Sequence, residues 1–101
     1  MTQKPATIIG VLHLRFDVPA ESLKDKRSVV QPVLARLRGK FNCSAGEVDD
    51  LDDISHATIA VACVSNDSRH CDSMLQSIVD YVEHERFDAE LIAVNTELVH
   101  V

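Results

Sequence analysis

The chain has 101 residues, the length of a single domain, and its 46 % hydrophobic and 26 % charged residues are typical of a soluble globular protein. Its formal net charge of −6 argues against the protein as a whole binding a polyanion. Three Phe, one Tyr and no Trp argue against a platform of exposed rings on which nucleic-acid bases stack.

The first residues and the cysteines favour a cytoplasmic protein. Residues 1–6 are polar, without the apolar stretch of an export signal, and no segment approaches the roughly 18 apolar residues of a membrane helix. We therefore expect a cytoplasmic protein with a short polar tail over 1–6 and one domain over 7–101. Cys43, Cys63 and Cys71 form no CxxC pair, so we interpret them as buried or half-buried thiols without a disulfide or zinc.

The first strand is predicted over residues 7–17. Ile8, Leu12 and Leu14 fall on one face, while Ile9 and Val11 fall on the other. A strand with apolar residues on both faces is typical of the centre of a sheet.

A helix is predicted over residues 22–39. Ser22 suits the N-cap position, and Gly39 suits the stop. Pro32 removes one backbone hydrogen bond and predicts a bend near Ser28; two shorter helices are the alternative. The predicted buried stripe follows helical spacing and consists of Leu23, Val30, Val33, Leu34 and Leu37.

The second half of the chain repeats this order. A shorter, more polar strand over 41–49 and an acidic turn over 49–55 precede a strand over 57–65 that is apolar on both faces. Asn66 or Asp67 caps a second helix that runs to about Glu85. The last strand is predicted over 89–99, and its polar residues favour an edge position.

This βαββαβ order predicts an α+β, ferredoxin-like plait with a four-stranded antiparallel sheet and two helices on one face. Right-handed crossovers place the first and third strands side by side at the centre. The other sheet face is then uncovered and partly apolar, which predicts a homodimer or larger homo-oligomer packed through it. A monomer with a mildly apolar surface is the alternative.

The first helix concentrates positive charge. From Lys24 to Lys40 the segment carries +5, and because the whole chain is −6, the remainder carries −11. Lys24, Arg27 and Arg38 share one helical face, which suits contact with a phosphate backbone. The alternative, which the sequence alone favours, is a solvated face paired with acids. The candidate RNA-binding or partner-binding residues are Lys24, Lys26, Arg27, Arg36, Arg38 and Lys40.

Other constellations give weak signals. The acidic turn does not have the spacing of a calcium loop, so a solvated hairpin is favoured over a cation site or a basic partner. His56 stands near Asp52 and Asp53 without metal-ligand spacing. The sequence contains no GxSxG, P-loop or GxGxxG motif. We therefore expect no metal, no cofactor and no catalytic residues.

Three segments resemble the YlxP-like family of small bacterial proteins. They are SLKDKR at 22–27, FNCSAGEVD at 41–49 and ATIAVACVSND at 57–67, and the resemblance extends from about residue 7 to residue 98. Cys43 and Gly46 depart from the family pattern, which loosens the second strand. The resemblance implies a ferredoxin-like fold. The family has no known function, but its members tend to be encoded near genes for translation initiation and ribosome maturation.

The leading hypothesis is therefore a non-enzymatic accessory factor that contacts ribosomal RNA or a ribosomal protein through the six cations. A dimeric ligand-binding or regulatory module is the alternative. An acylphosphatase-like hydrolase is disfavoured because the loop at 18–21 has no glycine and contains an acid, Glu21, that repels phosphate.

Overall fold

The computed structural model describes residues 4–101 and confirms the element order. Residues 4–7 precede the first strand in neither helix nor strand, and the rest of the predicted tail lies outside the described residues. The elements are β1 (Ile8–Asp17), α1 (Leu23–Lys40), β2 (Ser44–Asp49), β3 (His56–Ser65), α2 (Ser68–His84) and β4 (Glu90–His100).

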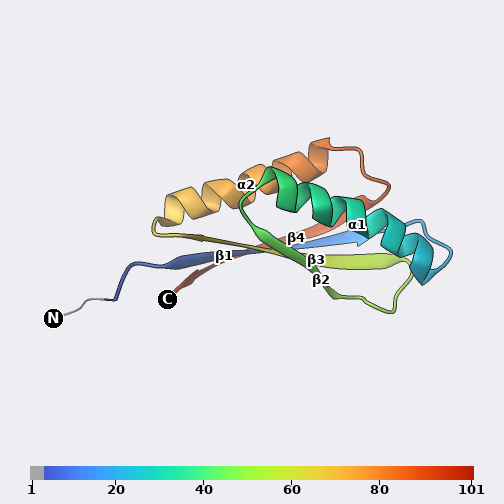
Figure 1. The fold of residues 1–101 in the computed structure, drawn as a ribbon, viewed down its shortest axis with the longest axis horizontal. Coiled ribbons are helices and arrows are strands. Elements are labelled where there is room, and N and C mark those ends of the chain that lie inside the picture. Colours follow the sequence, from blue (N-terminus) through green and yellow to red (C-terminus); the bar gives the residue numbers. More distant parts are fainter. Residues whose placement is uncertain (1–3) are drawn as a thin grey trace.

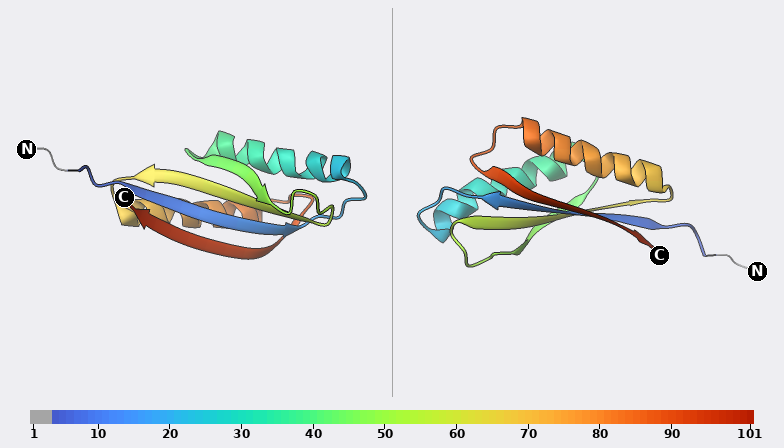
Figure 2. Two further views of the ribbon diagram at one scale, coloured as in Figure 1. Left: turned by 90° about the horizontal axis from the view of Figure 1, so that it is seen from below. Right: turned by 180° about the vertical axis from the view of Figure 1, so that it is seen from behind.

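The four strands form one antiparallel sheet in the order β2-β3-β1-β4. The apolar strands β1 and β3 lie at its centre, as predicted, and pair Leu12 with Val61. Figure 1 shows α1 and α2 on the same side of the sheet. Figure 2 shows from below that neither helix covers the other side, which we call the open face. The fold is therefore the predicted ferredoxin-like plait.

Two predicted boundaries and one alternative are wrong. The helix α1 continues past Gly39 to Lys40, and β2 begins at Ser44 rather than Phe41. Phe41 instead closes the helix. Its N–H donates to the Leu37 carbonyl, and its ring packs edge-to-face with the Tyr81 ring, with the ring centres 5.6 Å apart. The alternative of two shorter helices is also wrong, since α1 is one helix through Pro32.

The helix N-termini form as the sequence predicts. The Ser22 hydroxyl accepts a hydrogen bond from the Asp25 N–H, and the Asp25 carboxylate accepts one from the Glu21 N–H. Asp67 caps α2 by accepting from the N–H groups of Arg69 and His70. These bonds satisfy backbone donors that have no partner within the helix.

The core lies between the helices and the sheet, and α2 packs closely on β1 at Gly10. The buried thiols of Cys63 and Cys71 lie here with their sulfur atoms 3.6 Å apart. Burial and the hydrogen bond with Cys71 raise the pKa of Cys63 to about 11. A β-carbon at Gly10 would come within 2.6 Å of the Cys71 sulfur. Glycine therefore allows α2 to pack closely on β1.

The close packing at Gly10 gives a test of this core. We expect Gly10→Ala to lower the free energy of unfolding by about 1–3 kcal/mol, because the added methyl group overlaps Cys71. Gly46→Ala is the matched control, since a β-carbon there meets nothing within 4 Å. Urea denaturation measures both. Equal stability of the two variants would contradict the close packing at Gly10.

Candidate functional site

The most unusual side chain in the protein is the buried lysine at position 26. Lys26 is only 2 % exposed although it carries a charge. Its ammonium group donates to the backbone oxygens of Asp50, at 2.5 Å, and Asp53, at 2.7 Å. It also lies 3.0 Å from Glu47 Oε2, an ion pair without hydrogen-bond alignment. We call this arrangement the Lys26 clamp.

The clamp holds the acidic turn against α1. A buried ammonium group needs acceptors to offset its desolvation, and two carbonyls with one carboxylate supply them. The acidic turn therefore meets the first helix of its own chain, and Lys26 pairs with an acid as the alternative interpretation of this helix predicts. Lys26 is engaged inside the protein, so we leave it out of any exposed binding surface.

The same turn is held from the open face through Asp50. This residue has a left-handed backbone with φ 59°, a conformation that Asp tolerates better than most residues. Its carboxylate accepts hydrogen bonds from Thr58, at 2.6 Å, and Arg15, at 3.1 Å. The hydrogen bond from Thr58 is the larger cause, and that from Arg15 the next, by which the pKa of Asp50 is lowered below its ordinary value. Asp50 is therefore fixed by its side chain on one side and by Lys26 on the other.

The sequence carried a signal for the clamp that we misread. Lys26 precedes Val30 by four residues and Val33 by seven, so it lies on the buried stripe of α1. We placed Leu23 on this stripe instead, but Leu23 is 40 % exposed. Basic residues are normally counted as surface residues, which is why the spacing alone did not identify Lys26 as buried.

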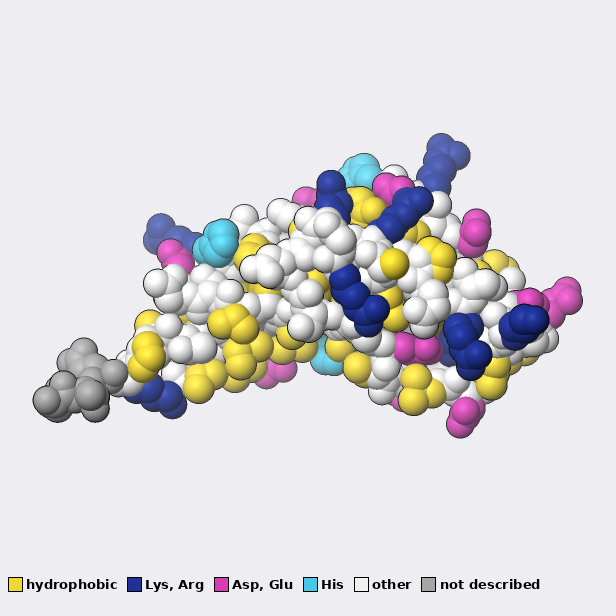
Figure 3. All heavy atoms as spheres, viewed as in Figure 1, with side chains coloured by type: hydrophobic (Ala, Val, Ile, Leu, Met, Phe, Trp, Pro, Cys, Tyr) yellow, Lys and Arg dark blue, Asp and Glu magenta, His cyan; other side chains and the backbone are white. Residues whose placement is uncertain are grey.

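The other five candidate cations lie on exposed parts of α1, in different surroundings. Lys24 and Arg27 are exposed near the N-terminus of the helix. Arg38 is exposed but donates twice to the Ala45 carbonyl, which ties α1 to β2. Figure 3 shows Lys and Arg side chains spread along the surface over α1. We call Lys24, Arg27 and Arg38 the α1 outer face.

Arg36 and Lys40 belong to an aromatic cluster where α1 and α2 end. The Tyr81 ring packs edge-to-face with the rings of Phe41 and Phe87. Arg36 pairs with Glu85 and lies over Phe87, and Lys40 lies 5.2 Å from the centre of the Tyr81 ring. The rings are half-buried and covered by these cations. They join the helix ends and do not form a free stacking platform.

Comparison with known proteins places this architecture in a family. A family model described as "Protein of unknown function (DUF503)" matches residues 9–96. The chain belongs to this family. It is also 31 % identical over 64 residues to "Uncharacterized protein YlxP" of Bacillus subtilis (strain 168), a match that covers 63 % of this chain and 70 % of that protein. The YlxP-like resemblance is thus confirmed, and neither description names an activity.

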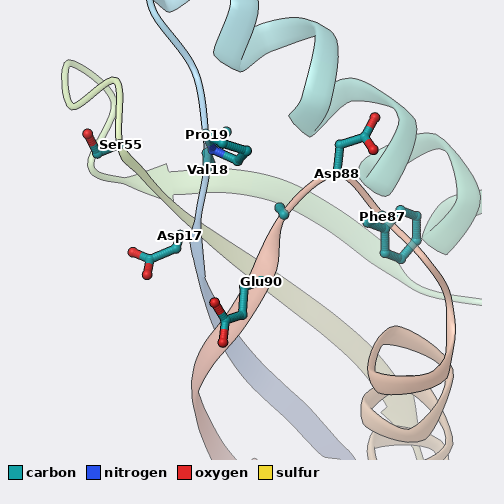
Figure 4. Close-up of a pocket in the computed structure, with 8 residues that line it drawn as sticks. Asp17, Val18, Pro19, Ser55, Phe87, Asp88 and Glu90 are labelled. Carbon is teal, nitrogen blue, oxygen red and sulfur yellow. The ribbon is translucent and has the colours of Figure 1, made fainter.

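A cavity of about 500 Å³ opens in this DUF503 protein where β1 ends and β4 begins. Val18, Pro19 and Phe87 give it apolar walls. Figure 4 shows Asp17 and Glu90 extending to the same side of it, and the two residues face each other across β1 and β4. Asp88 also lines the cavity. Such an acidic rim repels phosphate, which disfavours acylphosphatase-like chemistry at this loop.

His56 is held by carboxylates on both sides. Its Nε2 lies 3.0 Å from Asp17, and its Nδ1 lies 2.9 Å from Asp53. The backbone hydrogen bond from Ser55, followed by the bond from His56, lowers the pKa of Asp53. His56 therefore bridges β1 and the acidic turn.

No helix within residues 4–101 is long and apolar enough to cross a membrane.

The Lys26 clamp predicts an unequal response of two neighbouring lysines. Lys26→Met keeps the aliphatic chain but removes the ammonium group, leaving Glu47 and two carbonyls without it. We expect the free energy of unfolding to fall by about 2–4 kcal/mol. Lys24→Met, on the exposed side of the same helix, should change it by about 0.5 kcal/mol or less. Urea denaturation that gives equal losses for both variants would rule out the clamp.

The acidic turn predicts a loss of stability in acid. Asp50 and Asp53 both have pKa values below the ordinary 3.8 in the folded protein. Their contribution to stability is complete above pH 3.8 and is lost as the pH falls through the lowered values. Asp50→Asn should therefore make the acid limb of the stability curve shallower. Thermal unfolding measured as the pH is lowered through 3.8 tests this. If the wild type and Asp50→Asn lose stability with falling pH to the same extent, Asp50 does not have this role.

Proposed function

We propose that this DUF503 protein is a non-enzymatic factor that binds RNA through the α1 outer face, in association with translation or ribosome maturation. The observation that supports this proposal is the position of Lys24, Arg27 and Arg38. All three are exposed and lie on one side of a rigid helix that is fixed to the sheet by the Lys26 clamp.

The spacing of these cations suits a phosphate backbone. Lys24 and Arg38 are separated by 14 positions, which corresponds to about 21 Å along an α-helix. That length spans several phosphates of a nucleic-acid strand, and Lys and Arg displace their counterions without reading the base sequence. The half-buried aromatic cluster offers no free rings for base stacking, which favours contact with the RNA backbone.

The charge distribution orients such a contact. The helix segment from Lys24 to Lys40 carries +5 and the rest of the chain −11, while Asp17, Asp88 and Glu90 gather at the cavity between β1 and β4. An RNA strand is attracted to α1 and repelled by the acidic parts of the protein. The family resemblance adds an association with translation genes. An acidic ribosomal protein is the other possible partner, and the experiment below distinguishes it from RNA.

The test is charge reversal on the α1 outer face. Lys24→Glu/Arg27→Glu should raise the dissociation constant for a labelled single-stranded RNA of about 20 nucleotides by tenfold or more at moderate salt. The slope of log K against log salt should become shallower by roughly 1.4, since two phosphate contacts are lost. Fluorescence anisotropy measures both quantities, and sedimentation with ribosomal particles at low and high salt tests the same variant.

The control makes the same charge change elsewhere. Arg69→Glu/Arg86→Glu alters two exposed arginines, one in the first turn of α2 and one just after that helix. This control should retain most of the RNA affinity. Equal weakening by both pairs would mean that only net charge matters and would overturn the site. If the wild-type protein does not bind the labelled RNA but still sediments with ribosomal particles in a salt-sensitive way, the partner would instead be an acidic ribosomal protein.

A further inference from the structure

We infer that the open face of the sheet binds a second copy of this chain, so that the protein is a homodimer with its two sheets face to face. Neither helix covers this face (Figure 2). The shape, charge and size of the face are those expected for contact with a second copy of the chain.

The face consists of cross-strand rows that change in character along the strands. One row joins Val99 of β4, Ile9 of β1 and Val64 of β3. Val64 is 68 % exposed, the most exposed of the large hydrophobic residues in the described chain. This row lies where β1 begins and where β3 and β4 end. In Figure 3 hydrophobic side chains gather along the underside of this end of the protein, next to the N-terminus. We call this row the apolar ridge.

Next to the ridge the same face is hollow. The residues here are small, and they leave a shallow groove of about 200 Å³ whose lining includes Val11, Gly46, Ala60 and Ala62. A β-carbon added at Gly46 would meet nothing within 4 Å. The ridge and the groove are therefore neighbours on one surface, a protrusion beside a hollow.

This arrangement is self-complementary. A two-fold axis between ridge and groove, with the strands of the two copies antiparallel, places each ridge in the groove of the other copy. The two contacts are then identical, as the interface of a two-fold dimer requires. Small residues at the centre allow two sheets to approach to the usual packing distance of about 10 Å.

The charges on the open face permit a second copy there. The chain carries −6, which makes most of its surface repel a copy of itself. On the open face Arg15 is neutralised by Asp50 at 3.1 Å, and Glu97 stands on the edge strand β4. The ridge and the lining of the groove carry no charge, and the charge that borders them is Glu97, which pairs with Val11 at the β4 side.

The size of the overlap suits a weak dimer. β2 has 6 residues against 10 or 11 in the other strands, so the face is not equally long everywhere. An axis beside the ridge overlaps about half of the strand length, roughly 20 Å, over four strands at about 4.8 Å spacing. The total buried area is then roughly 800 Å² for two copies, the size of a weak or transient complex, and we expect a dissociation constant of about 10 µM or more.

The experiment is sedimentation velocity of the full chain from about 1 to 100 µM. Wild-type protein should sediment as two chains at the upper concentrations. Val64→Asp should sediment as one chain, because it places a charge on the apolar ridge, and Ala62→Asp should do the same from the groove. Leu51→Asp is the matched control, since Leu51 is 58 % exposed in the acidic turn and lines a hollow beside α1 with Leu23 and Arg27. It should remain dimeric.

Other outcomes overturn the proposal. Wild-type protein that is monomeric throughout shows that this face does not bind a second copy. A dimer that persists in Val64→Asp with a native circular dichroism spectrum places the interface elsewhere, for example along the edge strand β4. Val64 is exposed, so this variant stays informative if Ala62→Asp fails to fold.

Salt separates this inference from RNA binding. Two copies of charge −6 repel each other less as screening increases, so dimerisation should tighten between low and physiological salt. RNA binding should weaken over the same range. Lys24→Glu/Arg27→Glu should leave dimerisation intact. Either proposal can therefore fail while the other stands.

Discussion

The burial of one ammonium group, that of Lys26, determines how the first helix sits on the sheet. A charge without water must have acceptors within hydrogen-bond distance, and the carbonyls of Asp50 and Asp53 with the Glu47 carboxylate supply them. This requirement fixes both the rotation of α1 and the path of the turn between β2 and β3. The rotation in turn leaves Lys24, Arg27 and Arg38 together on an exposed side of the helix, away from Lys26.

The acidic turn has an internal role in this structure. Its backbone oxygens bind Lys26, Asp50 binds Arg15 and Thr58 through its carboxylate, and Asp53 binds His56. Several acids that give the chain its negative charge are therefore used to hold the turn. A single loop thereby links α1, β1 and β3, and it gives the α1 outer face a rigid support.

The two proposed surfaces lie on opposite sides of the molecule. The helices cover one face of the sheet, and the open face looks the other way (Figure 1). Pairing of two open faces would build four layers, helices outside and sheets inside, with both α1 outer faces exposed. Such a dimer would present two cationic helices to RNA, and two linked contacts bind more tightly than one. The two functions are compatible in space and differ in their response to salt.

Much of the fold was predictable because it depends on local patterns. The apolar alternation of β1 and β3 identified central strands, Ser22 and Asp67 marked the helix starts, and the βαββαβ order identified the plait. Segment 41–43 was misassigned as strand because its side chains suit one, whereas the contact between Phe41 and Tyr81 decides its place. That contact joins residues 40 positions apart in the sequence, beyond any local pattern.

The candidate site was only partly predictable. The sequence by itself determined that positive charge concentrates on the first helix and that one sheet face carries apolar residues. The tertiary structure alone decided that Lys26 is buried, that Arg36 and Lys40 cover aromatic rings, and that the acidic turn folds back onto its own helix. Charge is a property of the residue type. The exposure of a side chain depends on which distant segments of the chain contact it, and these contacts form only when the chain folds.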